Sequence, residues 1–292
     1  MIGFIKSEYG IGVESAEPAK RGFYGETWRL EAVGSAYFLK IVYPPEHKYV
    51  YERSFHILRR ICDSGVEFVS RIVKTTRGAL SARFDGAVLG VFEWIDGVNM
   101  ETEETKPFEY QMLAKVYTVK PDGLNIPREN FSGNNSYAFY TRWNALEDEA
   151  LLSLFDKHRA KIEYRAARLK HFAGVCRRDA TNFFITHGDA GGNFFTGGGR
   201  NYLVDWDNPM LSPPERDAWF CMSFDWAAPA FHEALRSNGI NYALRRERLA
   251  YYCYDFFFYY LNAYVDALER ADVVEDYIEG WIKNSFALAD TW

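Results

Sequence analysis

The chain has 292 residues, a length that suits one large domain or two lobes that share a cleft. Hydrophobic residues make up 48% of it and aromatic residues 17%, which is enough for a folded core and excludes a wholly disordered protein. With 34 basic and 40 acidic residues the formal net charge is −6. A general nucleic-acid binder carries a basic face, so this balance argues against a nucleic-acid partner.

The cysteines and the apolar segments bear on the compartment. The four cysteines, Cys62, Cys176, Cys221 and Cys253, lie far apart in the sequence. Their spacing indicates neither a disulfide framework nor a zinc site. The first residues lack a signal-peptide pattern, and the longest apolar stretch, Leu249 to Tyr264, is rich in tyrosine and contains Asp255, unlike a membrane span. We therefore expect a soluble cytoplasmic protein without a membrane partner, whose oligomeric state the sequence leaves unknown.

The first hundred residues read mostly as strands. Residues Phe23 to Val42 alternate in the manner of a hairpin that turns at Val33-Gly34. A helix is predicted over Lys48 to Cys62, because Tyr51, Phe55, Leu58 and Ile61 recur at helical spacing. Further strand-like runs cover Glu67 to Lys74, Ala79 to Phe84, and Ala87 to Ile95.

After about Met100 the pattern becomes helical, so an α+β fold is expected. Helical periods cover residues 108–117, 143–155, 157–176 and 245–270, and a last helix ends near Leu288. A short run of strands from Phe183 to Asp205 interrupts these helices.

The most informative stretch carries His187-Gly188-Asp189 and Asp205-Trp206-Asp207. It reads as an apolar strand, a loop, a short strand from Asn193, a glycine hairpin at residues 197–199, and a strand that ends at Asp205. Such a hairpin folds the carboxylates toward each other. Phosphoryl transfer needs two kinds of group: a carboxylate that orients the attacking hydroxyl, and oxygen ligands that bind divalent ions. A lone His-Gly-Asp is as well explained by a simple turn, but the whole combination favours the catalytic interpretation.

This order resembles the catalytic segment of the protein-kinase-like fold, and it is similar to the aminoglycoside phosphotransferase and choline kinase family. The resemblance implies a two-lobe fold, with a nucleotide-binding lobe at residues 1–96 and a helical catalytic and acceptor-binding lobe at residues 97–292. It implies Asp189 as the catalytic base, His187 as a brace for its loop, and Asn193 and Asp205, assisted by Asp207, as magnesium ligands. One departure is that Asn193 follows Asp189 by four residues, where the family has five.

The same fold requires a cation on the third strand, paired with a carboxylate from the next helix. Lys40 lies in the apolar strand Tyr37 to Val42, and Glu52 lies twelve residues later in the predicted helix. Glu46 is an alternative partner, although it precedes the helical pattern. An unpaired lysine in an apolar strand is costly, which favours the functional interpretation over an ordinary strand lysine.

Two further segments fit nucleotide binding by their place in the chain. Gly22 and Gly25 lie where the family has its nucleotide-covering loop, although glycine turns are common. Phe92 to Gly97 resembles a hinge strand, with Glu93 and Ile95 as candidates for main-chain contacts to the adenine ring. The alternative is a plain strand that ends in an Asp-Gly turn.

The resemblance therefore predicts a kinase that uses ATP, or GTP, with magnesium and phosphorylates a hydroxyl of a small cationic molecule. The acid surplus of the last third suits such an acceptor, and Asp225, Glu233, Asp255 and residues 272–279 are candidates, although charge runs usually mark solvated helix faces. Two rival readings are an inactive nucleotide-binding protein of this fold and a metal-dependent phosphohydrolase. In the hydrolase reading Lys40 and Glu52 have no task.

Overall fold

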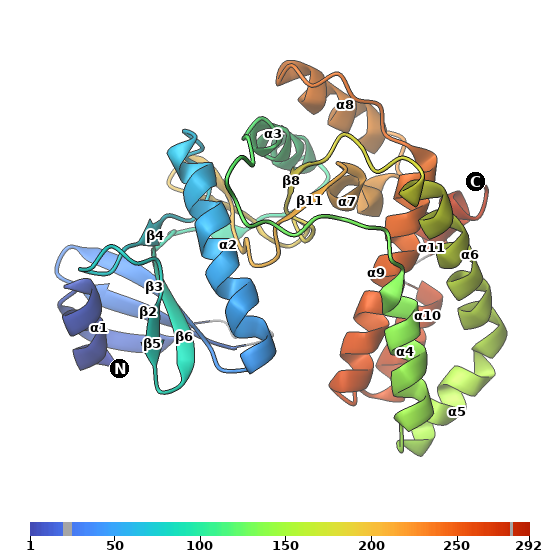
Figure 1. Cartoon of the computed structure of the whole chain (residues 1–292), viewed down its shortest axis with the longest axis horizontal. Helices are drawn as coiled ribbons and strands as arrows, with labels where there is room; N and C mark the ends of the chain where they lie inside the picture. Colours follow the sequence, from blue (N-terminus) through green and yellow to red (C-terminus); the bar gives the residue numbers. More distant parts are fainter. Residues whose placement is uncertain (20–24, 281–282) are drawn as a thin grey trace. The chain divides into compact units, whose positions relative to one another are not determined.

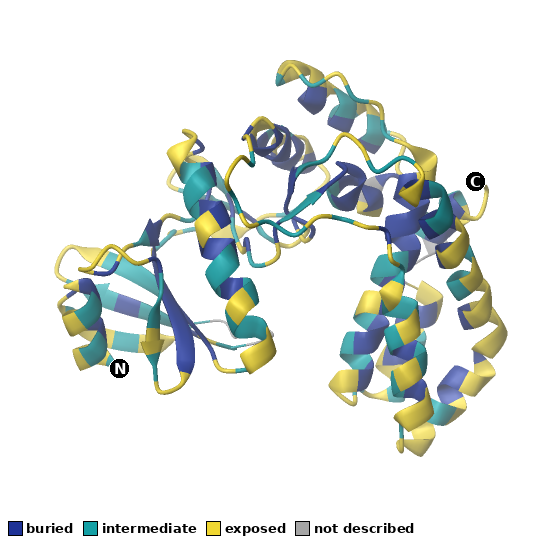
Figure 2. Ribbon diagram, viewed as in Figure 1, coloured by how far each residue is buried: buried dark blue, intermediate teal, exposed yellow. Residues whose placement is uncertain are grey.

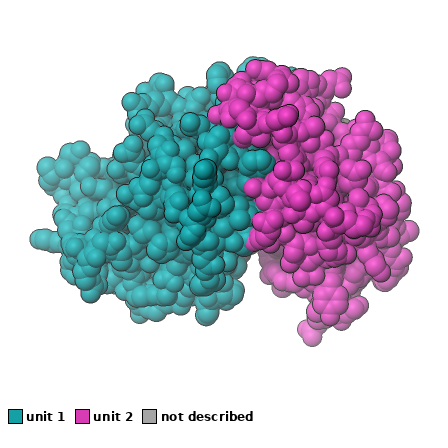
Figure 3. All heavy atoms as spheres, turned by 45° about the horizontal axis from the view of Figure 1, so that its top comes forward, with its two compact units in different colours: residues 1–127, 184–211 teal, residues 128–183, 212–292 magenta. Residues whose placement is uncertain are grey.

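The computed structural model describes residues 1–19, 25–280 and 283–292 (Figure 1). The chain forms two compact units, residues 1–127 with 184–211 and residues 128–183 with 212–292 (Figure 3). The first unit thus holds the N-terminal sheet, the hinge-like strand and the segment from His187 to Asp207. The lobes expected at residues 1–96 and 97–292 stay a prediction, since these units divide the chain by compactness alone.

The strands of the first unit form mainly antiparallel pairs. One sheet has the order β1-β2-β3-β6-β4, with β5 also paired to β6, a second has the order β10-β9-β7, and a third pairs β11 with β8. Their bounds are β1 (Val13–Pro18), β2 (Gly25–Ala32), β3 (Ser35–Val42), β4 (Ile72–Val73), β5 (Ala82–Phe84), β6 (Ala87–Glu93), β7 (Val98–Asn99), β8 (Phe184–Thr186), β9 (Phe194–Gly197), β10 (Arg200–Leu203) and β11 (Met210–Ser212).

The two faces of the large sheet are covered by different helices. Strand residues alternate between faces, and Leu39, Ile41, Leu89 and Val91 form a core with Ile5 of α1 (Ile2–Tyr9). The opposite face receives α2 (Pro45–Asp63). The central strand β6 is consequently buried along nearly its whole length (Figure 2).

Helix α2 approaches the sheet closely at one point. Lys40 and Gly90 are paired in register on β3 and β6. The Phe55 ring of α2 lies over Gly90, where an added Cβ atom would come within 2.7 Å of the ring. The Phe55 and Phe92 rings meet edge to face at 5.5 Å. The face that receives α2 is thus also the face to which Lys40 belongs.

The second unit is helical. Helix α9 (Arg246–Asp266) buries five aromatic side chains completely or nearly so, Tyr251, Tyr252, Tyr254, Phe257 and Phe258. The remaining helices are α3 (Lys106–Tyr117) in the first unit and, in the second, α4 (Asn134–Ala145), α5 (Glu149–Lys157), α6 (Arg159–Arg177), α7 (Glu215–Ala218), the 3₁₀ turn Trp219–Cys221, α8 (Ala227–Ser237), α10 (Ala271–Gly280) and α11 (Lys283–Ala289).

The α+β class with an N-terminal antiparallel sheet is confirmed, while some predicted bounds are wrong. The single helix expected over residues 143–155 is divided, because α4 ends at Ala145 and Asp148 caps a new helix by accepting the Leu151 N–H at 2.9 Å. Helix α1 and strand β1 had no clear pattern in the sequence. None of the helices described in the structure has the length and apolar character that a membrane crossing requires.

Candidate active site

Lys40, near the end of β3, has two carboxylate partners. Its Nζ atom donates to Asp205 Oδ1 at 2.8 Å and also to Asp207 Oδ2. The Lys40 side chain is 9% exposed, whereas those of Asp205 and Asp207 are 44% and 31% exposed. The lysine is therefore buried, and both carboxylates remain accessible to a ligand from solvent.

The charges of this cluster change one another's pKa values. Burial alone would lower the pKa of Lys40, but the charges of Asp207 and Asp205 outweigh it and raise that pKa. Burial, helped by the charge of Asp205, raises the pKa of Asp207 to about 7. Burial also acts to raise the pKa of Asp205, but Lys40 and hydrogen bonding lower it overall. Two carboxylates thus share one ammonium group, and negative charge is in excess.

The expected partner of Lys40, Glu52, is not in contact with it. Its carboxylate instead accepts hydrogen bonds from Arg83 at 2.8 Å and from Ser81 at 3.4 Å. The physical reason is helical geometry, since successive residues of α2 differ in direction by roughly 100°. The turn of α2 that faces the sheet therefore presents Tyr51, and Glu52 is directed toward Arg83.

Tyr51 is the residue of α2 that reaches the lysine, and the sequence did not single it out for this role. The Tyr51 hydroxyl donates to Asp207 Oδ2 at 2.7 Å, and the Lys40 Nζ atom lies 4.8 Å from the centre of its ring. Burial and the charge of Asp207 raise the pKa of Tyr51, so the hydroxyl stays protonated as a donor. The available signal was the apolar helical face, to which Tyr51 belongs.

His187 connects the two motifs. Its Nε2 atom lies 2.8 Å from the Val204 carbonyl oxygen, and its Nδ1 atom accepts the Asp189 N–H at 3.2 Å. The Nε2 atom must therefore carry the proton, because the carbonyl can only accept. The His187 ring also meets the Trp206 ring edge to face, with centroids 4.5 Å apart. The expected folding of one motif toward the other is present, with the imidazole as the link.

Asn193 lies beside both motifs. Its Nδ2 atom donates to the Asp189 carbonyl at 2.6 Å, and its own carbonyl accepts the Val204 N–H at 3.0 Å. Asp205 follows Val204 with φ at +61°, a left-handed conformation that aspartate tolerates better than most residues. The Asp189 side chain is exposed. The backbone of this segment therefore brings Asp189, Asn193 and Asp205 into one local framework.

Only some of the residues predicted to contact the nucleotide lie in the part of the chain that the structure describes. Gly22 lies outside the described residues, and Gly25 is the first residue of β2, opposite Val42. The Glu93 N–H donates to the Arg71 carbonyl at 2.9 Å, so a contact from Glu93 to a nucleotide would have to use its carbonyl. The Ile95 N–H donates no hydrogen bond to the described residues and stays a candidate donor to a nucleotide.

The acidic candidates for the acceptor belong to the second unit. Glu233 bonds Arg236 and Ser237, and Asp272 bonds Arg270, which fits solvated and paired helix faces. Asp255 differs from them. Its Oδ2 atom accepts from Asn135 at 2.9 Å, while its Oδ1 atom is buried and accepts no hydrogen bond from the described residues. Burial, with the charge of Glu129, raises the pKa of Asp255 to about 7.

The donor set around Asp205 suits a divalent cation such as magnesium. Magnesium prefers carboxylate and carboxamide oxygens. Asp205 and Asp207 present carboxylates whose combined charge exceeds that of Lys40. The Asn193 carboxamide uses its nitrogen toward the Asp189 carbonyl, which leaves its oxygen for another partner. These residues therefore fit an ion that brings two further positive charges.

The fold has a kinase-like architecture. The model of a known family, the phosphotransferase enzyme family (APH), matches residues 15–257. The chain belongs to this family and is a small-molecule kinase. No curated protein matches the chain in sequence.

Solved structures share the fold at low sequence identity. The spectinomycin phosphotransferase APH(9)-Ia, in complex with ADP and spectinomycin, has a TM-score of 0.78 and 19% identity over 99% of this chain and 96% of that chain. The choline kinase LicA from Streptococcus pneumoniae has a TM-score of 0.67 and 14% identity over 99% and 97% of the two chains. The amicoumacin kinase hAmiN, bound to AMP-PNP and Ca²⁺, has a TM-score of 0.66 and 13% identity over 99% and 92%.

Proposed function

We propose that the chain transfers the γ-phosphate of ATP to a hydroxyl of a small cationic molecule, such as an aminoglycoside, an aminocyclitol or an amino alcohol. ATP is favoured over GTP because similar solved proteins were obtained with ADP, AMP or AMP-PNP. The cationic acceptor is favoured by spectinomycin and amicoumacin in two of them and by the acid surplus of this chain.

Asp189 is proposed as the base that orients the acceptor hydroxyl and takes its proton. The exposure of its side chain gives an acceptor access to it, and His187 holds its backbone through the Asp189 N–H. Because His187 uses both ring nitrogens in this brace, its role is to position the loop and not to exchange protons. Lys40 is proposed to neutralise phosphate oxygens with its ammonium group.

Asn193 and Asp205, with Asp207 assisting, are proposed to hold magnesium. The ion would neutralise the charge of the transferred phosphoryl group. Tyr51 keeps the Asp207 carboxylate fixed through the 2.7 Å hydrogen bond from its hydroxyl. Glu93 and Ile95 are proposed to contact the adenine ring through main-chain groups, and Gly22 and Gly25 to lie near the phosphates.

One observation carries this proposal above the others. The imidazole of His187 links the Asp189 N–H to the Val204 carbonyl, next to Asp205. The base of one motif and the metal ligand of the other are thereby held in a common geometry. Phosphoryl transfer depends on such positioning more than on covalent chemistry.

The test of the mechanism is the change Asp189→Ala. We expect transfer to fall by about 10²- to 10⁴-fold, the usual contribution of a general base, while the affinity for nucleotide stays within about threefold. Asp122→Ala, which removes an exposed carboxylate elsewhere in the same unit, serves as the control. Full transfer activity in Asp189→Ala would exclude the proposed base.

The test of the substrate class is a screen of acceptors with ATP or GTP and magnesium. Amino sugars, aminocyclitols and amino alcohols are compared with neutral sugars and polyols, and release of the nucleoside diphosphate is measured. Acceptor-dependent release with amines alone supports a cationic acceptor. Hydrolysis of phosphoesters without nucleotide would instead favour the phosphohydrolase reading.

A further inference from the structure

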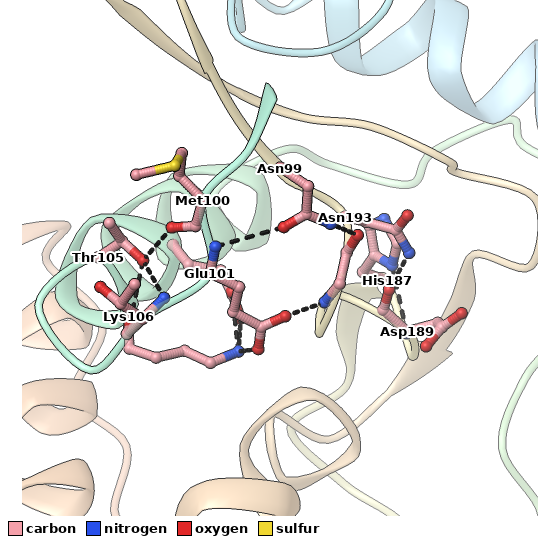
Figure 4. A network of polar contacts seen from close by, with 11 residues as sticks. Asn99, Met100, Glu101, Thr105, Lys106, His187, Asp189 and Asn193 are labelled. Atoms are coloured by element: carbon pink, nitrogen blue, oxygen red, sulfur yellow. Dashed lines mark hydrogen bonds and ion pairs between the residues drawn. The ribbon is translucent and has the colours of Figure 1, made fainter. Parts of the chain in front are cut away.

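The loop formed by residues 189–193 is held at Gly192 through two successive peptide groups, because the Gly192 N–H belongs to the 191–192 peptide and the Gly192 carbonyl to the 192–193 peptide. The Gly192 N–H donates to Glu101 Oε2, and the Gly192 carbonyl accepts from Asn99 Nδ2 (Figure 4). Asn99 ends β7, which pairs with β9, and the next N–H, that of Met100, donates to the Phe194 carbonyl at 3.2 Å. The segment 98–101 thus runs alongside the chain that leaves the loop.

Glu101 is supported by a buried lysine. Its Oε1 atom pairs with Lys106 Nζ, and the same Nζ atom lies 3.1 Å and 2.9 Å from the two carboxylate oxygens of Glu109. The side chains of Lys106 and Glu109 are only 7% and 2% exposed. Two carboxylates thus share this ammonium, and the outer one is directed to the Gly192 N–H. A hydrogen bond to a charged acceptor is about twice as strong as one between neutral groups.

The turn that carries Glu101 is itself closed by hydrogen bonds. Thr105 Oγ1 accepts the Thr102 N–H at 2.8 Å and donates to the Met100 carbonyl at 2.7 Å. The Glu101 N–H donates to Asn99 Oδ1 at 3.3 Å. Glu101 therefore projects from a fixed turn at the start of α3, which gives its carboxylate a defined position.

The loop has a need for such a partner. Gly191 and Gly192 are adjacent, and glycines lose more conformational entropy on ordering than other residues. Gly192 has φ at +82°, in the region that favours glycine, and Asn193 follows it directly. The orientation of the two peptide groups that flank Gly192 therefore sets where the Asn193 carboxamide lies relative to Asp189, whose carbonyl it bonds.

We propose that Glu101 is a positioning residue for phosphoryl transfer, which acts by fixing the Gly192 N–H so that Asp189 and Asn193 take their working geometry. Lys106 and Glu109 orient the Glu101 carboxylate, and Asn99 holds the Gly192 carbonyl, which belongs to the next peptide group. The proposal rests on the proposed roles of Asp189 and Asn193. A purely structural role, in which the three charged residues only anchor the start of α3, is the competing explanation.

Four variants separate these explanations. Glu101→Ala removes the bond to the loop, and Glu101→Gln keeps an acceptor oxygen of the same size without the charge. Glu109→Gln disturbs the buried pair with Lys106 but leaves the atoms that contact Gly192 in place. Glu103→Ala is the matched control, because it removes an exposed carboxylate from the same turn.

Two measurements are made on each variant of the complete chain. The first is the transfer rate, resolved into kcat and the KM for nucleotide. The second is amide hydrogen exchange of residues 188–195 in the protein without nucleotide, followed by mass spectrometry. Exchange reports on the loop whether or not the protein turns over, and a thermal unfolding curve records whether each variant is folded.

For Glu101→Ala we expect kcat to fall by about 10- to 100-fold, in line with the cost of misplacing reacting groups by about 1 Å, with KM for nucleotide within about threefold. Exchange in the loop should rise by about tenfold or more. Glu101→Gln should retain a kcat between that of Glu101→Ala and the unchanged protein. Glu103→Ala should match the unchanged protein in both measurements.

The outcomes are distinguishable. An unchanged kcat in Glu101→Ala, together with an inactive Asp189→Ala, overturns the positioning role and leaves the proposed function intact. Equal losses of kcat and thermal stability in Glu101→Gln and Glu109→Gln, without faster loop exchange, favour the purely structural role and overturn the proposal. If Glu101→Ala does not fold, Glu101→Gln decides by the same criteria. If the protein without any substitution shows no transfer activity, the proposed function is wrong, and the positioning role of Glu101 is wrong with it.

Discussion

The clusters around Lys40 and around Arg248 are both built on a buried cation, and they differ in their charge balance. In the first unit, Lys40 serves two carboxylates that are 44% and 31% exposed. In the second unit, Arg248 is 1% exposed and donates to the Tyr242 hydroxyl at 2.7 Å and to the Asp179 carbonyl at 2.6 Å. Tyr242 in turn donates to the carboxylate of Glu215, which is 0% exposed.

The difference shows what each cluster is for. Arg248 and Arg245 face the carboxylates of Glu215 and Asp179, so the charges of this cluster balance. Arg248 and Glu215 are closed to solvent, so their contribution is to folding. Around Lys40 negative charge is in excess and open to solvent, which is an arrangement that attracts further positive charge. Perturbed and unbalanced charges of this kind are typical of functional sites.

The largest effect on stability is expected where the balanced cluster is broken. Arg248→Met would remove the buried cation that bonds the Tyr242 hydroxyl and offsets the charge of the buried Glu215 carboxylate, and we expect the free energy of unfolding to fall by about 3–5 kcal/mol. Arg236→Met, which removes an exposed pair with Glu233, should change it by less than about 1 kcal/mol. Urea unfolding of both variants measures this, and equal losses would contradict the distinction.

The reverse pattern is expected for Lys40→Met. Transfer should fall by about 10²- to 10³-fold, because a preorganised charge at the phosphates is lost. The free energy of unfolding should change less than for Arg248→Met, since Asp205 and Asp207 remain partly hydrated. Transfer rates and urea unfolding are measured on the same preparations. A stability loss as large as that of Arg248→Met would mean that Lys40 is mainly structural.

Asp255 is a carboxylate whose pKa burial and the charge of Glu129 raise although Arg216 opposes them, so its effect on stability depends on pH. The pKa of Asp255 is raised to about 7 in the folded protein, whereas that of an aspartate in the unfolded chain is about 4. The folded state therefore binds the proton more tightly, and the contribution of Asp255 to the free energy of unfolding is complete below about pH 4 and is lost as the pH rises through 7. Asp255→Asn should therefore stabilise the protein by roughly 1–2 kcal/mol at pH 8 and by less at pH 5. Thermal unfolding at both pH values tests this, and an equal gain at both would exclude the ionisation of Asp255 as the cause.

The smallest effects separate two neighbours on α2. Tyr51→Phe removes the hydroxyl that bonds Asp207, and we expect transfer to fall by about five- to tenfold, about the value of one hydrogen bond. Glu52→Gln alters only the contacts with Arg83 and Ser81, away from Lys40, so transfer should stay within about twofold. A larger loss of transfer activity in Glu52→Gln would instead support the pairing of Glu52 with Lys40 that the sequence predicted.

The sequence predicted what depends on local pattern and missed what depends on the direction of side chains. The strand with Lys40, the glycine hairpin and the α+β class follow from alternation and turn residues, and the structure has them. The choice between Tyr51 and Glu52 required the rotation of α2 about its axis, which the apolar face already indicated. The bonds from Asn99 and Glu101 to Gly192 join segments some ninety residues apart, and no local pattern records such a contact.

The close approach of Phe55 to Gly90 limits which residues can replace glycine at position 90. The spacing between α2 and the sheet leaves room only for the hydrogen atom of Gly90, since an added methyl group there would lie 2.7 Å from the Phe55 ring. Tyr51 sits one helical turn before Phe55 on the same face. The alignment of the Tyr51 hydroxyl with Asp207 therefore depends on a residue of β6 that has no side chain.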